Sequence, residues 1–243
     1  MKLSNLHEAV VKSPKGDVAS CANQILDKLV RSILAGEPIK PHHWVVGEVL
    51  VPRTDGSTIN TEVWALIQKR TRSKASREGS PPERLLVGAN GEAHNILDCA
   101  AFWTGHTRDK YWVEVQLVYE LPDDIDTIDY RLSIEKPAML RIISQYLDHE
   151  LAHIARPIGT SQKKHKRYIP HEQLSLEWDA NITSIVRYWE RLSAEQRDEI
   201  KDYKQLVNNV DPALIRFYWD PIEWRKRLIA SLVKNGIVIR AEV

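Results

Sequence analysis

The sequence is poor in the features that mark secreted and membrane proteins. It has only two cysteines among 243 residues, Cys21 and Cys99, and they are far apart in the chain. Two thiols cannot stabilise a chain of this length, so we expect reduced cysteines and a reducing compartment, with one long-range disulfide as the alternative. No apolar segment approaches the ~20 residues that span a bilayer, and the N-terminus lacks the apolar core of a secretory signal. These absences predict a cytoplasmic protein without a membrane partner.

The sequence also lacks an excess of charge of one sign. Thirty-four Lys and Arg residues stand against 33 Asp and Glu residues, which gives a net charge of +1. No overall field therefore attracts nucleic acid or anionic lipid. Two local basic clusters, at residues 70–77 and 163–167, leave nucleic acid open as a partner, but such runs are typical of solvated loops. The apolar fraction of 43% is enough to bury a core.

The first half of the chain is rich in strand signals. Helical spacing of apolar residues predicts one amphipathic helix over residues 17–35, ended by Gly36. Asp55-Gly56 lies between two β-prone runs, an arrangement typical of a hairpin. Strands are predicted at residues 43–51, 59–68, 85–87, 111–121 and 130–134.

The second half is rich in helix signals. Residues 69–83 have no apolar side chain larger than that of Ala75 and are expected to form a flexible loop. Helices are predicted at residues 137–155, 172–192, 194–207 and 212–234. Strands first and helices later predict an α+β fold with a mostly antiparallel sheet. Since no flexible linker separates the halves, we expect a single domain over residues 1–243 with a helical C-terminal subregion at about 172–236.

The sequence His149-Glu150-Leu151-Ala152-His153 is an HExxH motif on a predicted helix. Residues four apart lie on one helical face, so both imidazoles can bind one Zn²⁺ ion. Glu150, turned about 100° around the axis, can serve as general base for a water activated by the metal. About 0.02 chance matches are expected in a chain of this composition, which favours a metal motif over two unrelated histidines.

A catalytic zinc ion normally takes three protein ligands and one water, so a third ligand is required. The downstream candidates are His165, His171, Glu177 and Asp179. Glu177 is favoured because it borders the apolar stripe of the helix predicted at 172–192, where a carboxylate can face a neighbouring helix. His171 is the main alternative.

These residues resemble the zincin superfamily of metallopeptidases, including its gluzincin and ImmA/IrrE-like branches. Glu177-Trp178-Asp179-Ala180-Asn181 is similar to the E-x-E-A-N segment of the ImmA/IrrE-like enzymes, in which a glutamate of the second helix completes the metal site. The resemblance covers only residues 148–181. It implies metal ligation by His149, His153 and Glu177, and a role for Asp179 in orienting a ligand histidine. It also implies an edge strand directly before the active-site helix, at residues 129–134.

The sequence therefore predicts a zinc metallopeptidase of the zincin type that acts on a protein or peptide substrate, with Glu150 as its catalytic base. Tyr168, His171 and Tyr188 are candidates for stabilising the oxyanion. Two alternatives stay open. One is a non-enzymatic interaction or structural protein with a vestigial or structural metal site, and the other is a DNA-associated protease that docks through its basic loops.

Overall fold

The computed structural model describes residues 18–35, 43–53, 55–69, 97–107, 110–119, 128–155, 175–208, 221–237 and 239. Its elements are α1 (Val18–Ala35), β1 (His43–Pro52), β2 (Thr58–Lys69), β3 (Leu97–His106), β4 (Tyr111–Tyr119), α2 (Ile128–Ile154), α3 (Ser175–Arg191), α4 (Ala194–Glu199), α5 (Tyr203–Asn208) and α6 (Pro221–Lys234). The chain forms two compact units, one with the described residues of 18–50 and 60–147, the other with those of 51–59 and 148–239. The single domain over residues 1–243 stays a prediction.

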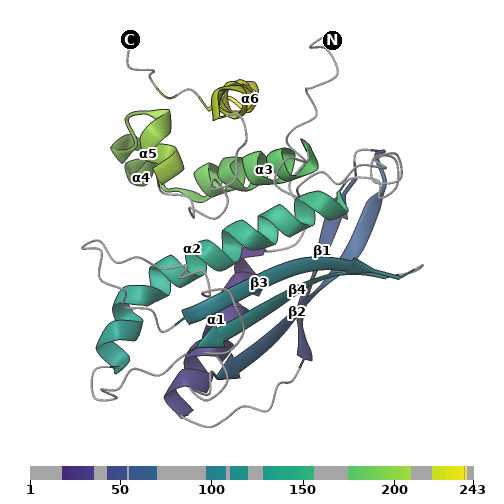
Figure 1. The fold of residues 1–243 in the computed structure, drawn as a ribbon, viewed down its shortest axis with the longest axis vertical. Coiled ribbons are helices and arrows are strands. Elements are labelled where there is room, and N and C mark those ends of the chain that lie inside the picture. The colour runs from purple at the N-terminus through teal and green to yellow at the C-terminus, as the bar shows by residue number, and fades with distance from the viewer. Residues whose placement is uncertain are drawn as a thin grey trace. The chain divides into compact units, whose positions relative to one another are not determined.

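The predicted α+β class is confirmed. Four strands form one sheet in the order β1-β2-β4-β3, and the strands precede the helices α2 to α6 (Figure 1). β3 and β4 are antiparallel, whereas β2 and β4 are parallel, with Val63 opposite Val113. β1 and β2 are joined by a turn of a few residues, which brings adjacent strands back in opposite directions. The sheet is therefore mostly antiparallel, with one parallel pair at its centre.

The hairpin predicted at Asp55-Gly56 is present. The amide of Arg53 donates to the carbonyl of Ser57 at 2.8 Å, and the amide of Ser57 donates to the Asp55 carboxylate at 2.9 Å. Gly56 has a φ of 86°, a conformation that a residue without Cβ adopts at little cost. The Asp-Gly pair thus supplies both the side-chain acceptor and the backbone freedom of this turn.

Helix α1 packs on the sheet through the face that its sequence predicts. The apolar residues from Ala22 to Ile33 are buried, but Leu34, at the end of that predicted face, is exposed. On β4, alternate residues from Val113 to Tyr119 are buried, as their period of two predicts. The Tyr119 hydroxyl donates to the Ser32 carbonyl at 3.1 Å, which fastens β4 to α1, and burial raises the pKa of Tyr119.

The strand predicted at residues 130–134 is wrong, because α2 begins at Ile128 and includes Pro137. Tyr130 and Ile134 are exposed and Leu132 is buried, a pattern that fits a helix as well as a strand. Residues four apart share a helical face, and the residue midway lies on the opposite side. The alternation of apolar residues over 130–134 is therefore too short to distinguish a strand from a helix.

The edge strand expected directly before the active-site helix is also wrong. The last described strand before α2 is β4, which lies inside the sheet between β2 and β3. The described edge strands are β1 and β3. β3 was not predicted at all, because its Ala100, Ala101 and Gly105 have low strand propensity. Gly105 is needed there, since a Cβ would lie 2.3 Å from the Trp112 ring.

The helices after α2 follow the prediction with one difference among the described residues. The helix predicted at 194–207 is divided into α4 and α5, and Ile200 between them is extended, with φ −87° and ψ 104°. Ser193 begins α4 with a capping box that it forms with Gln196. The last described helix is α6, which starts at Pro221; residues 209–220, and with them the predicted start at residue 212, lie outside the described part. No helix among the described residues is long and apolar enough to cross a membrane.

Candidate metal centre

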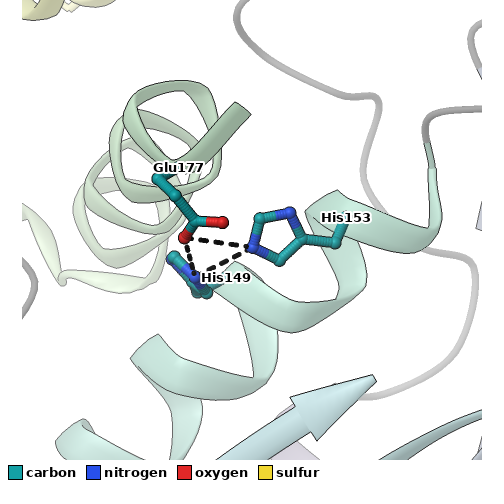
Figure 2. Close-up of side chains that lie close together, drawn as sticks. All are labelled: His149, His153 and Glu177. Atoms are coloured by element: carbon teal, nitrogen blue, oxygen red, sulfur yellow. Dashed lines mark hydrogen bonds and ion pairs between the residues drawn. The ribbon is translucent and has the colours of Figure 1, made fainter. Parts of the chain in front are cut away.

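His149 and His153 lie on one face of the C-terminal part of α2, as their spacing predicts. Their ring centroids are 4.7 Å apart and their planes are nearly perpendicular. The two Nε2 atoms are 3.0 Å apart and face the same point (Figure 2). A single ion could contact both atoms, since the two rings already converge without it.

Glu177 of α3 completes a compact group with the two histidines. Its Oε2 lies 3.3 Å from Nε2 of His149 and 3.5 Å from Nε2 of His153 (Figure 2). Ligands bound about 2.1 Å from a tetrahedral ion are about 3.4 Å from one another. All three distances are close to that value, so the donor atoms have the spacing of one face of a tetrahedral site. These three residues therefore form a group that could hold a metal ion.

The Glu177 carboxylate is set up to be an anionic ligand. Burial alone would raise its pKa, but the contacts with His149 and then His153 outweigh burial and hold the pKa well below its usual range. Glu177 also lies in the first turn of α3, where the helix dipole favours negative charge. The His153 side chain keeps 20% of its surface exposed, so solvent reaches one side of the group.

The face of α3 that carries Glu177 is more buried than the sequence indicates. Ile182 and Ile185 of the predicted apolar stripe are buried, as expected. Asn181 and Ser184, predicted to lie beside that stripe, are buried too. The Ser184 hydroxyl donates to the Asn181 backbone carbonyl at 2.9 Å, which satisfies one of these polar groups inside the helix. Polar residues thus line the buried side of α3 that meets α2.

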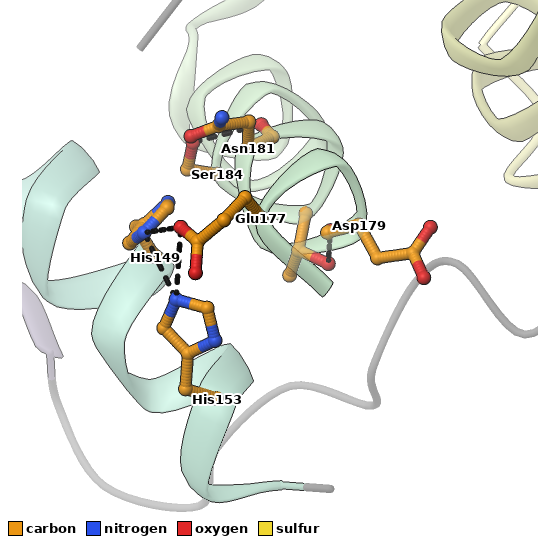
Figure 3. Close-up of polar contacts among 7 residues, drawn as sticks. His149, His153, Glu177, Asp179, Asn181 and Ser184 are labelled. Carbon is orange, nitrogen blue, oxygen red and sulfur yellow. Dashed lines mark hydrogen bonds and ion pairs between the residues drawn. The ribbon is translucent and has the colours of Figure 1, made fainter. Parts of the chain in front are cut away.

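Asp179 does not face the ligand histidines that the resemblance would have it orient. It lies two residues beyond Glu177, and two residues turn a helix by about 200°. Its carboxylate accordingly points away from His149 and His153, on the other side of α3 (Figure 3). The exposures of Glu177 and Asp179 are nearly equal, at 8% and 9%. These two carboxylates therefore differ mainly in direction.

A second set of charged contacts between α2 and α3 was not found from the sequence. Asp148, the residue before the first histidine, forms an ion pair with Arg191 at 2.5 Å. Burial raises the pKa of Asp148, and Arg191 and then Arg187 oppose that shift. Arg187 is itself buried and pairs with Glu190. The local sequence around Asp148 or Arg191 does not predict this ion pair, because the two residues are 43 positions apart and meet only when the helices pack.

His149 and Asn181 each have a buried polar atom whose hydrogen-bonding capacity no described residue uses. Nδ1 of His149 and Oδ1 of Asn181 are both buried and have no hydrogen-bond partner within the described part of the chain. Asn181 is one helical turn beyond Glu177 and so lies on the same side of α3 (Figure 3). A histidine that binds a metal through Nε2 usually donates its other ring N–H to an acceptor that fixes the ring. We therefore expect Asn181 to provide that acceptor, either directly or through a water molecule.

Replacing Asn181 by alanine should weaken metal binding by about 10- to 100-fold, the usual effect of removing such an acceptor. Asn181→Asp retains an acceptor at the same position and should bind metal more tightly than the alanine variant. Competition against a chromophoric chelator measures both affinities. Equal affinity of the alanine variant and the unchanged protein would show that Asn181 does not orient His149.

The remaining predicted site residues are not in the three-residue group. Glu150 is buried on α2, and its role as general base stays a prediction. Tyr188 is on α3, three turns beyond Glu177, and its role in stabilising the oxyanion stays a prediction. His165, His171, Tyr168 and both basic clusters lie outside the described residues.

Comparisons with protein-family models, with curated proteins and with solved structures find no match.

Proposed function

We propose that this protein is a zinc-dependent metallopeptidase whose metal is held by His149, His153 and Glu177. The observation that carries the proposal is the spacing of 3.0, 3.3 and 3.5 Å among three donor atoms from two helices. Two of the donors belong to an HExxH motif, in which the glutamate is positioned by the same helix. Metal ligands and catalytic base thus come from one short segment and one facing helix.

The donor set suits zinc. Two imidazole nitrogens and one carboxylate oxygen form a ligand set that catalytic zinc sites use, with a further position for water. The carboxylate is anionic, since the pKa of Glu177 is held well below its usual range. When bound, zinc lowers the pKa of a coordinated water to about 7 and polarises a carbonyl oxygen.

In this proposal Glu150 accepts the proton of the attacking water and passes it to the amine that leaves. A carboxylate beside the ligands is suited to this task because it is fixed by the helix that carries both histidines. The substrate class is a protein or peptide, since activated water attacking an amide carbonyl yields a carboxylate and an amine. The cleavage preference depends on surfaces that the three-residue group does not define.

Removal and return of the metal tests the proposal. Hydrolysis of a mixture of unstructured labelled peptides should be lost after treatment with a chelator and should return when zinc is added. The same protein with His149→Ala should show no hydrolysis under either condition. Hydrolysis that is unaffected by the chelator, or retained in His149→Ala, would contradict the proposal.

A metal site without catalysis is the second candidate. The burial of His149 and Glu177, each 8% exposed, is the observation that favours it, because a catalytic zinc needs an open position that water and substrate can reach. Bound zinc together with no hydrolysis of any peptide would support this candidate. The DNA-associated protease stays a prediction, since the basic loops on which it depends lie outside the described residues.

A further inference from the structure

We propose that the Asp148–Arg191 ion pair is a clamp that positions Glu177 for metal binding. The inference rests on the proposed metal site but adds two residues that have no place in the ligand set. Asp148 and Arg191 do not touch the donor atoms. They act through the position of α3 on α2, so both are positioning residues.

The clamp joins the two elements that carry the ligands. Asp148 directly precedes His149 on α2, and its side chain is only 2% exposed. Arg191 is the last residue of α3, and Glu177 lies in the first turn of the same helix. The contacts that hold Glu177 in place therefore include one at each end of α3, and both reach the segment of α2 between residues 148 and 153.

The length of α3 makes the contact at its far end important. Fourteen residues separate Glu177 from Arg191, which is about 21 Å along a helix. A displacement of α3 that follows the release of its C-terminal end would move Glu177 as well, because the helix is a rigid rod. Metal–ligand distances tolerate only about 0.2 Å. If α3 is not held at Arg191, Glu177 can therefore move out of bonding distance of the metal while the fold remains intact.

The charges around Asp148 explain why the pair can hold. A buried carboxylate without a partner is costly, so removing the Arg191 charge would leave the buried Asp148 charge poorly compensated. Arg187, which is buried on α3 one turn before Arg191, lies near the same carboxylate and pairs with Glu190. Two cations and two carboxylates thus balance one another where the end of α3 meets α2.

Arg197 provides a matched control. It lies on α4 and donates to the carbonyls of Trp189 at 3.2 Å and Glu190 at 2.8 Å, at the same end of α3. Its guanidinium also lies over the Trp189 ring. Arg197→Gln therefore also removes an arginine at the end of α3, but one that does not pair with Asp148.

The test is a double-mutant cycle on zinc affinity, measured by chelator competition with the full chain. Arg191→Gln should weaken zinc binding by about 10-fold or more, and Arg197→Gln should leave it within about 2-fold. In the background of Glu177→Gln, Arg191→Gln should have no further effect, because the ligand that it positions is already gone. A general loss of structure would instead weaken zinc binding in both backgrounds.

The Co²⁺ spectrum gives a second readout. With Co²⁺ in the site, the visible spectrum of Arg191→Gln should shift toward that of Glu177→Gln, and Arg191→Lys should restore part of the original spectrum. Additive losses in the cycle, or an unchanged spectrum in Arg191→Gln, would overturn the clamp. Failure of the unchanged protein to bind zinc or Co²⁺ would instead overturn the proposed metal site.

Discussion

Glu150→Gln should abolish peptide hydrolysis while the protein still binds one zinc ion. Glutamine has the shape of glutamate but cannot accept a proton, so the change removes general-base catalysis without removing a ligand. Loss of a positioned acid or base typically reduces the rate by about 100- to 10,000-fold. The rate of cleavage of a labelled peptide mixture and the zinc content of the same preparation measure the two effects together.

Glu135→Gln is the control for this prediction. Glu135 is on the same helix and is as buried as Glu150, at 7% against 8%, but it lies 15 residues before Glu150. Its replacement should leave hydrolysis unchanged per folded molecule. Full activity in Glu150→Gln would mean that another group is the base. Equal losses in both variants would mean that the changes act through the fold of α2 rather than through chemistry.

Zinc should raise the thermal stability of the protein strongly, and this effect should disappear in His153→Ala. A ligand that binds only the folded state stabilises it by about 4 kcal/mol when its free concentration is about 1,000 times Kd. For a chain of this size, that corresponds to an increase in Tm of about 8–16 °C. Thermal melts followed by circular dichroism, with and without zinc, measure the increase.

His106→Ala is the control for zinc binding to exposed histidines. His106 is exposed at the end of β3, where it stacks on Tyr111 with ring centroids 5.7 Å apart. Its replacement should keep the full zinc-dependent increase in Tm. An increase that persists in His153→Ala would show that zinc stabilises the protein from some other site.

The parts of the fold that sequence predicted correctly depend on local signals. The helix at 18–35 has apolar residues at helical spacing, and the hairpin has an Asp-Gly pair whose φ and side chain fit the turn. The start of α2 was missed because three alternating apolar residues fit either period, and Pro137 looked like a first-turn residue. β3 was missed because its partner β4, rather than its own composition, makes it a strand.

The candidate site shows the same division. His149 and His153 follow from the sequence because one helix sets their separation, and Glu177 follows from its place beside an apolar stripe. The direction of Asp179 follows from helical geometry, since two residues turn a helix by about 200°. The Asp148–Arg191 pair could not be predicted from the sequence, since it depends on how two helices pack and its residues are 43 positions apart in the chain.

Zinc content after dialysis at a fixed free zinc concentration tests the central claim most directly, with the unchanged protein compared against Glu177→Gln and Asp179→Asn. Both substitutions neutralise a carboxylate of similar burial on α3, but only Glu177 faces the histidines (Figure 3). The account predicts one zinc per chain in the unchanged protein and in Asp179→Asn, and much less in Glu177→Gln. A folded protein that retains no zinc, or a loss in Asp179→Asn rather than in Glu177→Gln, would contradict it.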